Sequence, residues 1–256
     1  MTPSRFGLAL AALMLLPMAA SAQDSLKAEI APGGKLRVAL IGVRVLGGVG
    51  EPIGKFLAER LGLPFEAVTF PDPQAYEESF AAPAWDIAIG PRVLAPADKA
   101  DVTPDAWLIE LLYLAAPGHT FSAMNEVDRS GVSVGTIRNS PSDRFLSRTL
   151  KSATLVRLAL SPKFPADAID MLRSGAADVF GADSGLIAAI SAGYPEGNIV
   201  PGAFNTVRVA FALPKGRSVA AQAWLAGLLA EAKRTGVVQK AIEQAGLKTG
   251  VRVAQD

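Results

Sequence analysis

The chain has 256 residues, half of them apolar and 19% charged, which is usual for a globular protein of one large domain or two lobes. Basic and acidic residues nearly balance, at 25 against 24, which argues against nucleic acid as a partner. There is no cysteine and one histidine, so disulfides, thiolate chemistry and multi-histidine metal sites are excluded. We expect neither a metal ion nor a cofactor.

The first 22 residues have the pattern of a cleavable export signal. They carry one early cation, Arg5, an apolar run from Leu8 to Leu16, and the small-residue sequence Ala20-Ser21-Ala22. The apolar run is too short to span a bilayer, so we favour cleavage over a retained membrane anchor. The sequence therefore predicts a soluble periplasmic protein whose folded part begins after a short linker over 23–34.

The segment after this linker alternates between strand and helix patterns. Buried strands are predicted over 35–42, 65–70 and 85–90, an amphipathic helix over 51–62 and a short helix over 73–81. This β-α-β-α-β order predicts a parallel sheet with covering helices.

A second block then repeats the same order. Strands are predicted over 131–137, 153–160 and 177–183, and helices over 140–150 and 165–175. The two blocks also share a local detail, since Asp86 and Asp178 each open a short apolar strand after a helix and a small-residue loop. We interpret this as an internal architectural repeat.

The C-terminal segment contains a strand over 206–216 and helices over 218–236 and 237–246. These helices have apolar stripes without a partner of their own, so we expect the chain to return and pack them on the first block. The prediction is an α/β protein of two lobes, each a mainly parallel sheet with flanking helices. Lobe 1 comprises 35–114 and 208–256, lobe 2 comprises 115–207, and a cleft lies between them.

Loops that follow the carboxyl ends of the strands should face this cleft. These loops are 41–50, 90–94, 136–143 and 181–185. Arg44, Arg92 and Arg138 each lie in one of the first three loops, where a solvated surface arginine is the alternative interpretation. Together they favour at least one contact with an anion.

The sequence Ser140-Pro141-Ser142-Asp143 has the order of a capping box at a helix start. It either only begins the helix or also presents free N–H groups to a carboxylate, with Arg138 beside it. The charge of Asp143 disfavours phosphate unless its side chain caps Ser140. Asp183 has two interpretations as well, as a partner for a ligand ammonium or as a cap before Ser184-Gly185.

Two enzyme signatures are incomplete. The sequence LGGVGEPIG has Ile53 where a dinucleotide motif has its last glycine. In GADSG, which resembles a nucleophile elbow, the serine stands one position late. We therefore expect no catalytic residues and no enzymatic activity.

The order of these segments resembles the type II periplasmic solute-binding proteins of bacterial ABC importers, solute-binding protein family 3. The likeness runs from Lys35 to about Gly246. It is carried by the segments LRVALIG, FLAERLGLPFEAV, WDIAIG, EVDRSGVSVGTIRNSPSDRFLSRTL, AIDMLRSGAADVFGAD, VAFALPKG and LLAEAKRTGVVQKAIEQAG.

The resemblance implies two lobes that close on a small ligand, usually an amino acid or another organic acid. Asn139 and Ser140 stand where amino-acid binders have the Gly-Thr that helps to hold the α-carboxylate, and Asp183 stands where they receive the α-ammonium. The family's carboxylate-clamping arginine falls near Pro96 in VLAPADKADVTP, so this chain lacks it. Arg92 or Arg138 is the expected substitute.

Our first hypothesis is a monomeric periplasmic protein that captures a small carboxylate-bearing solute for an ABC permease in the inner membrane. The predicted ligand-binding residues are Arg44, Arg92, Arg138, Asn139, Ser140 and Asp183. Two alternatives stay open, an exported enzyme similar to cyclohexadienyl dehydratase and an accessory protein of a periplasmic dehydrogenase.

Overall fold

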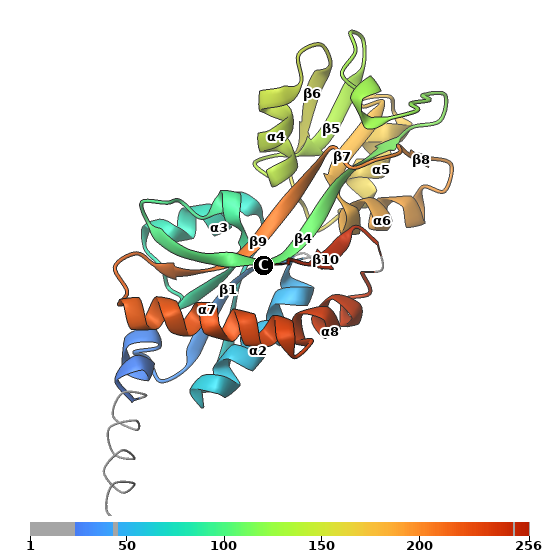
Figure 1. Ribbon diagram of the computed structural model, residues 1–256. Coiled ribbons are helices and arrows are strands. Elements are labelled where there is room, and N and C mark those ends of the chain that lie inside the picture. Colours follow the sequence, from blue (N-terminus) through green and yellow to red (C-terminus); the bar gives the residue numbers. More distant parts are fainter. Residues whose placement is uncertain (1–23, 43–45, 248, 256) are drawn as a thin grey trace, which may run out of the picture.

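The computed structural model describes residues 24–42, 46–247 and 249–255, and it shows an α/β protein of two lobes (Figure 1). The predicted export signal therefore lies outside the described residues. The strands are β1 (Leu36–Ile41), β2 (Phe65–Phe70), β3 (Ile87–Pro91), β4 (Ala100–Ala115), β5 (Ser133–Ile137), β6 (Thr154–Leu158), β7 (Val179–Asp183), β8 (Asn198–Ile199), β9 (Asn205–Pro214) and β10 (Val251–Val253). The helices are α2 (Gly47–Leu61), α3 (Pro73–Glu78), α4 (Pro141–Thr149), α5 (Ala166–Arg173), α6 (Ser184–Gly193), α7 (Val219–Arg234) and α8 (Val237–Gln244).

One sheet continues through both lobes, in the strand order β2-β1-β3-β9-β4-β7-β5-β6. Strands β2, β1 and β3 are parallel in the first lobe, and β6, β5 and β7 are parallel in the second. The two lobes are joined by β4 and β9, which pair antiparallel from Ala100↔Pro214 to Leu111↔Asn205. Strand β4 then continues into the second lobe, where Leu111–Ala115 pair with β7 (Figure 1).

Helix α2 packs closely on the first-lobe sheet because its N-terminal turn is rich in glycine. A Cβ atom on Gly47 would stand 2.7 Å from the carbonyl oxygen of Ile41, and one on Gly50 would stand 2.6 Å from Leu40. The helix therefore begins at Gly47, four residues before the predicted start at Glu51, and Pro52 lies inside it. Leu46, directly before this start, lines a cavity between the lobes.

The repeat predicted from Asp86 and Asp178 has a matching structural role in both lobes. The Asp86 carboxylate accepts from the backbone N–H of Arg37 at 2.8 Å, and that of Asp178 accepts from the N–H of Ser133 at 2.7 Å. Each aspartate thus binds the start of the neighbouring parallel strand. Asp86 is fully buried, and its charge is balanced by the guanidinium of Arg37 at 2.6 Å.

Two hydrophobic clusters form the core. The larger one includes all of the buried side chains of β1 and α2 and reaches into the second lobe at Val134, Leu146 and Val179. The smaller one lies in the second lobe between α5, α6 and the sheet, around Ile169, Phe180 and Ile187. Packing is therefore continuous across the crossing strands.

Some elements were not among the sequence predictions. The 16-residue strand β4, helix α6 and strand β10 are additional, and residues 24–30, within the predicted linker, form a helix whose Ile30 is fully buried. Glu29 of this helix accepts from the backbone N–H of Ser218 at 2.6 Å, which attaches the segment to the start of α7. Within the described ranges, no helix is long and apolar enough to cross a membrane.

Candidate functional site

A small enclosed cavity lies where the loops of both lobes meet the crossing strands. We call it the Asp183 cavity, and its volume is about 30 Å³. It is lined by Leu46, Pro91, Ile109, Leu111, Ile137, Ser140, Pro141, Ser142, Asp183, Leu186 and Val207. A water molecule occupies about 30 Å³ in the liquid, so a solute of several heavy atoms enters this space only when the lobes separate.

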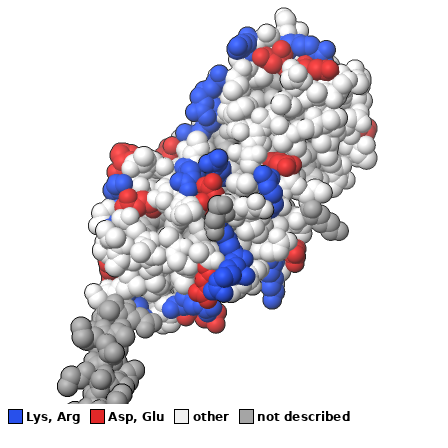
Figure 2. All heavy atoms as spheres, viewed as in Figure 1, with Lys and Arg blue, Asp and Glu red and all other residues white. Residues whose placement is uncertain are grey.

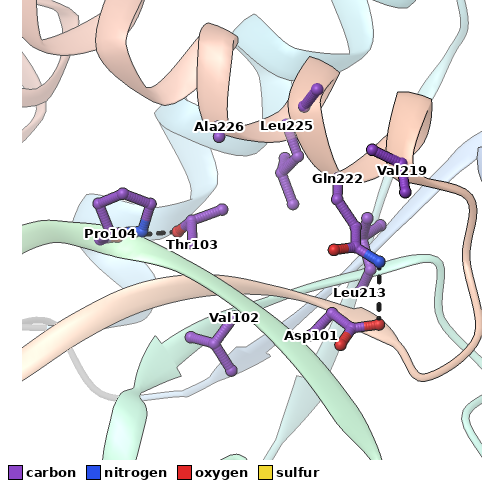
Figure 3. A pocket seen from close by; sticks show the side chains of 10 residues that line it. Asp101, Val102, Thr103, Pro104, Leu213, Val219, Gln222, Leu225 and Ala226 are labelled. Carbon is purple, nitrogen blue, oxygen red and sulfur yellow. Dashed lines mark hydrogen bonds between the residues drawn. The ribbon is translucent and has the colours of Figure 1, made fainter.

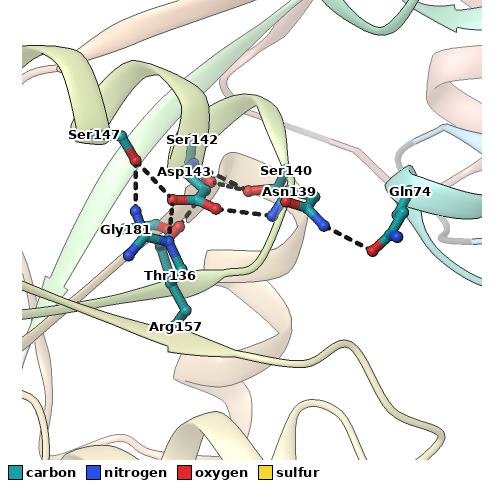
Figure 4. Close-up of polar contacts among 9 residues, drawn as sticks. All are labelled: Gln74, Thr136, Asn139, Ser140, Ser142, Asp143, Ser147, Arg157 and Gly181. Atoms are coloured by element: carbon teal, nitrogen blue, oxygen red, sulfur yellow. Dashed lines mark hydrogen bonds and ion pairs between the residues drawn. The ribbon is translucent and has the colours of Figure 1, made fainter. Parts of the chain in front are cut away.

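Three hydroxyl groups connect this cavity with the sheet behind it. The Thr136 hydroxyl donates to the carbonyl oxygen of Gly181 at 2.8 Å and lies 3.0 Å from the Ser142 hydroxyl, which lies 2.7 Å from that of Ser140 (Figure 4). A carbonyl oxygen only accepts, so the Thr136 hydroxyl donates its proton to Gly181. Ser142 must then donate to Thr136, and Ser140 must donate to Ser142. All three protons are therefore used within this network, and Ser140 and Ser142 present oxygen lone pairs at the cavity wall.

Ser140 caps helix α4 as predicted, because its hydroxyl accepts from the backbone N–H of Asp143 at 3.2 Å. The reciprocal bond of a capping box is shifted by one residue, since the Asp143 carboxylate accepts from the N–H of Asn139 at 2.8 Å. Asn139 makes this possible by adopting a left-handed backbone conformation with φ 59°. The other carboxylate oxygen accepts from Arg157 at 2.9 Å, so Asp143 is turned away from the cavity and its charge is balanced (Figure 4).

Asp183 caps helix α6, with its carboxylate accepting from the N–H of Leu186 at 2.9 Å. Asp183 is partly buried, and the desolvation of its carboxyl group raises the pKa to about 6 despite that bond. No lysine or arginine lines the Asp183 cavity in the described part of the chain. The cavity therefore presents a carboxyl group and hydroxyl lone pairs, a set that accepts hydrogen bonds and repels an anion.

A larger pocket of about 210 Å³ adjoins this cavity and shares Pro141 and Val207 with it. We call it the arginine pocket. It is lined by Arg92, Val93, Pro141, Phe145, Arg148, Asn205, Thr206, Val207 and Arg208. The first two residues follow β3 in the first lobe, the next three belong to α4 in the second, and the last four to the crossing strand β9. Figure 2 shows basic side chains, with acidic ones among them, where the two lobes meet.

Asp105 on β4 holds two of these arginines. Its carboxylate lies 2.9 Å from Nε of Arg92 and 3.6 Å from a terminal nitrogen of Arg208. Arg92 also donates to the carbonyl oxygen of Thr103. The pairing of β4 with β9 shifts register on both sides of Asp105, and such an irregularity is a common way to redirect a side chain.

Helices α3 and α4 join the two lobes directly beside these pockets. The Asn139 amide donates to the side-chain oxygen of Gln74 at 2.8 Å (Figure 4). Arg144 forms an ion pair with Glu77. The guanidinium of Arg144 thus reaches an acid on the opposite lobe. These contacts stabilise the conformation in which the lobes lie together.

The structure separates the six predicted site residues. Ser140 and Asp183 line the Asp183 cavity together, and Arg92 lies in the arginine pocket. Asn139 binds the opposite lobe, and Arg138 is exposed and lines neither pocket. Arg44 lies outside the described residues. Their roles in binding stay predictions.

Sequence reasoning missed Arg148, Arg208 and Phe145. Pro141, Phe145 and Arg148 follow one another at intervals of four and three along α4, so helical spacing already places them on one face. Nothing in the local sequence indicates that β9 passes beside this face. Arg208 is the one exposed residue of β9, between the buried Val207 and Val209, and no motif marks it.

A third pocket, of about 290 Å³, lies in the first lobe between β4 and α7 (Figure 3). Its wall is mainly apolar, and Val219 at its rim is 82% exposed. The polar groups in it are already paired, since Asp101 binds Lys215 at 2.6 Å and Gln222 at 3.3 Å, and Thr103 donates to the carbonyl oxygen of Pro104. It lies apart from the junction of the lobes and offers no free group to orient a ligand.

The sequence matches no protein-family model and no curated protein. Solved structures match over most of the chain. A solute receptor for L-cysteine from Neisseria gonorrhoeae has 18% identity and a TM-score of 0.68, covering 92% of this chain and 99% of its own. An amino acid ABC transporter substrate-binding protein from Streptococcus pneumoniae, bound to L-arginine, has 18% identity and a TM-score of 0.68, covering 84% and 96%.

A third match is an ancestral amino acid-binding protein described as a precursor of cyclohexadienyl dehydratase. It has 18% identity and a TM-score of 0.67, covering 86% of this chain and 98% of its own. At this identity the likeness establishes the fold, and the resemblance seen in the sequence is confirmed at that level. The protein has the two-lobe fold of type II periplasmic binding proteins, and its structural neighbours include solute receptors that bind amino acids.

Proposed function

We propose that the protein is a periplasmic solute-binding protein that captures a small carboxylate-bearing solute between its lobes and delivers it to an ABC permease. The observation that carries this proposal is the pair of adjoining pockets lined by residues of both lobes and of the crossing strand β9. A ligand that contacts both lobes binds the closed form more tightly than the open form, and this difference drives closure without catalysis. The protein acts as an exported monomer after removal of its signal segment.

The proposed ligand differs from that of amino-acid receptors. Among the described residues, the Asp183 cavity has no lysine or arginine to hold an α-carboxylate, and the protons of its two serine hydroxyls are used in hydrogen bonds within the chain. The basic groups lie instead in the arginine pocket. We infer an organic acid, or an amino acid bound in an unusual orientation, rather than a standard α-amino acid.

A thermal-shift screen of the purified mature protein tests this function. The panel contains L-amino acids, aliphatic dicarboxylates and aromatic monocarboxylates. A true ligand at 100 times its dissociation constant should increase the free energy of unfolding by about 2.7 kcal/mol. A flat response across all three classes would count against solute capture.

The small size of the Asp183 cavity favours a second candidate, an accessory protein of a periplasmic dehydrogenase that needs no small ligand. Permease and ATPase genes beside this gene would support transport, whereas quinoprotein and cytochrome genes would support the accessory role. A dehydratase activity rests on Asp183 alone, whose pKa of about 6 suits a general acid. Turnover of prephenate or arogenate by the purified protein would establish that activity.

A further inference from the structure

The arginine pocket has more positive charge than its acid balances. Three arginines line it, and Asp105 is the one acid that pairs with them among the described residues. Arg148 lies in the last turn of α4, is exposed, and has no ion pair in the described part of the chain. Within the described ranges, the ion pair of Arg208 is the long 3.6 Å contact with Asp105, and its side chain is 68% exposed. Two guanidinium groups are therefore available to an anion, and this group binds carboxylates through two parallel hydrogen bonds.

The same pocket has an apolar wall. Val93 is 44% exposed, and it lines the pocket together with Phe145, Pro141 and Val207. The ring of Phe145 lies 5.9 Å from that of Phe204, which in turn stacks on Tyr113 at 4.2 Å, so this wall is fixed by the core. A cavity of about 150 Å³ binds benzene, and hence a pocket of about 210 Å³ has room for a ring with a carboxylate.

Both lobes contribute to the pocket, so a ligand in it acts on closure. Arg92 and Val93 come from the first lobe, and Phe145 and Arg148 from the second. A carboxylate held by Arg148 and Arg208, with its apolar body against Val93, would connect the two. The lobes would then be held by the ligand in addition to the contacts between α3 and α4.

The neighbouring Asp183 cavity is the less favourable place for this anion. It holds about 30 Å³, and its polar wall consists of the Asp183 carboxyl group and serine oxygens that present lone pairs. A carboxylate there would meet the charge of Asp183 and, among the described lining residues, no lysine or arginine, which is unfavourable.

We propose that the arginine pocket is the solute site of this protein, and that it binds an organic carboxylate with an apolar or aromatic body through Arg148 and Arg208. This inference rests on the proposed solute-binding function and names its ligand class. Arg92 acts as a positioning residue, since Asp105 and Thr103 already occupy its guanidinium.

Isothermal titration of the mature protein with benzoate, phenylacetate, succinate and inorganic phosphate tests the proposal. We expect benzoate or phenylacetate to bind, and Arg148→Ala and Arg208→Ala to weaken that binding at least tenfold each, as for the loss of a charged hydrogen bond. Arg234→Ala is the matched control, because Arg234 is an exposed arginine in the last turn of α7. Circular dichroism of each variant verifies folding.

The outcomes separate this proposal from the function on which it rests. Binding of an aromatic carboxylate that is lost in Ser140→Ala but unaffected in both arginine variants would overturn the arginine pocket and leave solute capture intact. Binding of an L-amino acid that is insensitive to Arg148→Ala would do the same. Phosphate binding as tightly as benzoate would overturn the role of the apolar wall. Failure of all four probes and of every amino acid would overturn both.

Discussion

Asp183, one of the predicted ligand contacts, caps a helix and has a raised pKa. Its carboxylate caps α6 and receives a hydrogen bond from Leu186, and this bond alone would lower the pKa. Desolvation is the larger effect, and the pKa rises to about 6. At neutral pH the carboxyl group is charged, and its incomplete solvation in the folded state therefore destabilises the protein.

Stability should fall with rising pH because of this group. The unfolded carboxyl group titrates near pH 3.9, so above that pH the unfolded state releases a proton that the folded state retains until about pH 6. The destabilisation is absent below pH 4, grows between pH 4 and 6, and is then constant, on the order of 3 kcal/mol. Asp183→Asn should remove it and gain stability relative to the wild type over this range.

Urea unfolding of wild type and Asp183→Asn at pH 3.5, 5 and 7 measures the effect as a difference, which cancels other titrating groups. Asp98→Asn, at an exposed position, serves as the control. A stability difference between Asp183→Asn and wild type that does not change with pH would show that Asp183 is well solvated.

Local sequence predicted the residues whose role depends on local geometry. Ser140 caps α4 because a serine before Pro141 is sufficient to begin a helix. The partner of its hydroxyl proton was not predictable. That partner is set by the hydrogen bond from Thr136 to the carbonyl of Gly181, which is 45 positions from Thr136 in the sequence. The place of Arg148 beside the pocket was not predictable for the same reason, because its neighbour β9 is distant in sequence.

At the scale of elements, α3 and α4 carry the contacts that hold the lobes together. Gln74 binds Asn139 and Glu77 binds Arg144, and all four groups lie at the surface of the junction or are partly buried there. Each contact is of the kind that contributes about 0.5 to 1 kcal/mol. Their sum is comparable to the free-energy difference that separates conformers of hinged proteins.

The double variant Gln74→Ala/Glu77→Ala should therefore shift the protein toward a more open conformation. A loss of roughly 1 to 2 kcal/mol changes the ratio of closed to open forms by about 5- to 30-fold. Small-angle X-ray scattering should report a larger radius of gyration for the variant. Glu51→Ala, which removes an ion pair within α2, is the control, and an equal radius for all three proteins would exclude a closing role for these contacts.

Most of the predicted strands and helices are present, because hydrophobic periodicity and cap residues suffice to define them. Strand β4 was missed although it has 16 residues, since its burial changes phase at the irregularity around Asp105 and its sequence lacks a steady alternation. The helix over 24–30 was missed because its short sequence is polar and is stabilised by Glu29 binding to Ser218.

At the scale of the whole molecule, the crossing strands make the lobes parts of one folding unit. The sheet is continuous from β2 to β6, and the larger hydrophobic cluster includes residues of both lobes. The residue bounds of the lobes stay a prediction. The lobes share one sheet and one hydrophobic cluster and are connected through the crossing strands. Loss of either crossing strand would expose apolar surface in both lobes.

Equilibrium unfolding should accordingly be a single transition. All three tryptophans, Trp85, Trp107 and Trp224, belong to the first lobe or its crossing strand, so their fluorescence reports that lobe. Far-ultraviolet circular dichroism reports helices of both lobes, including α4, α5 and α6. We expect the two signals to give the same urea midpoint and slope, because a cooperative unit exposes its whole core at once. A dichroism transition that continues after fluorescence is complete would mean that the second lobe is stable by itself, held by its own cluster around Ile169 and Phe180.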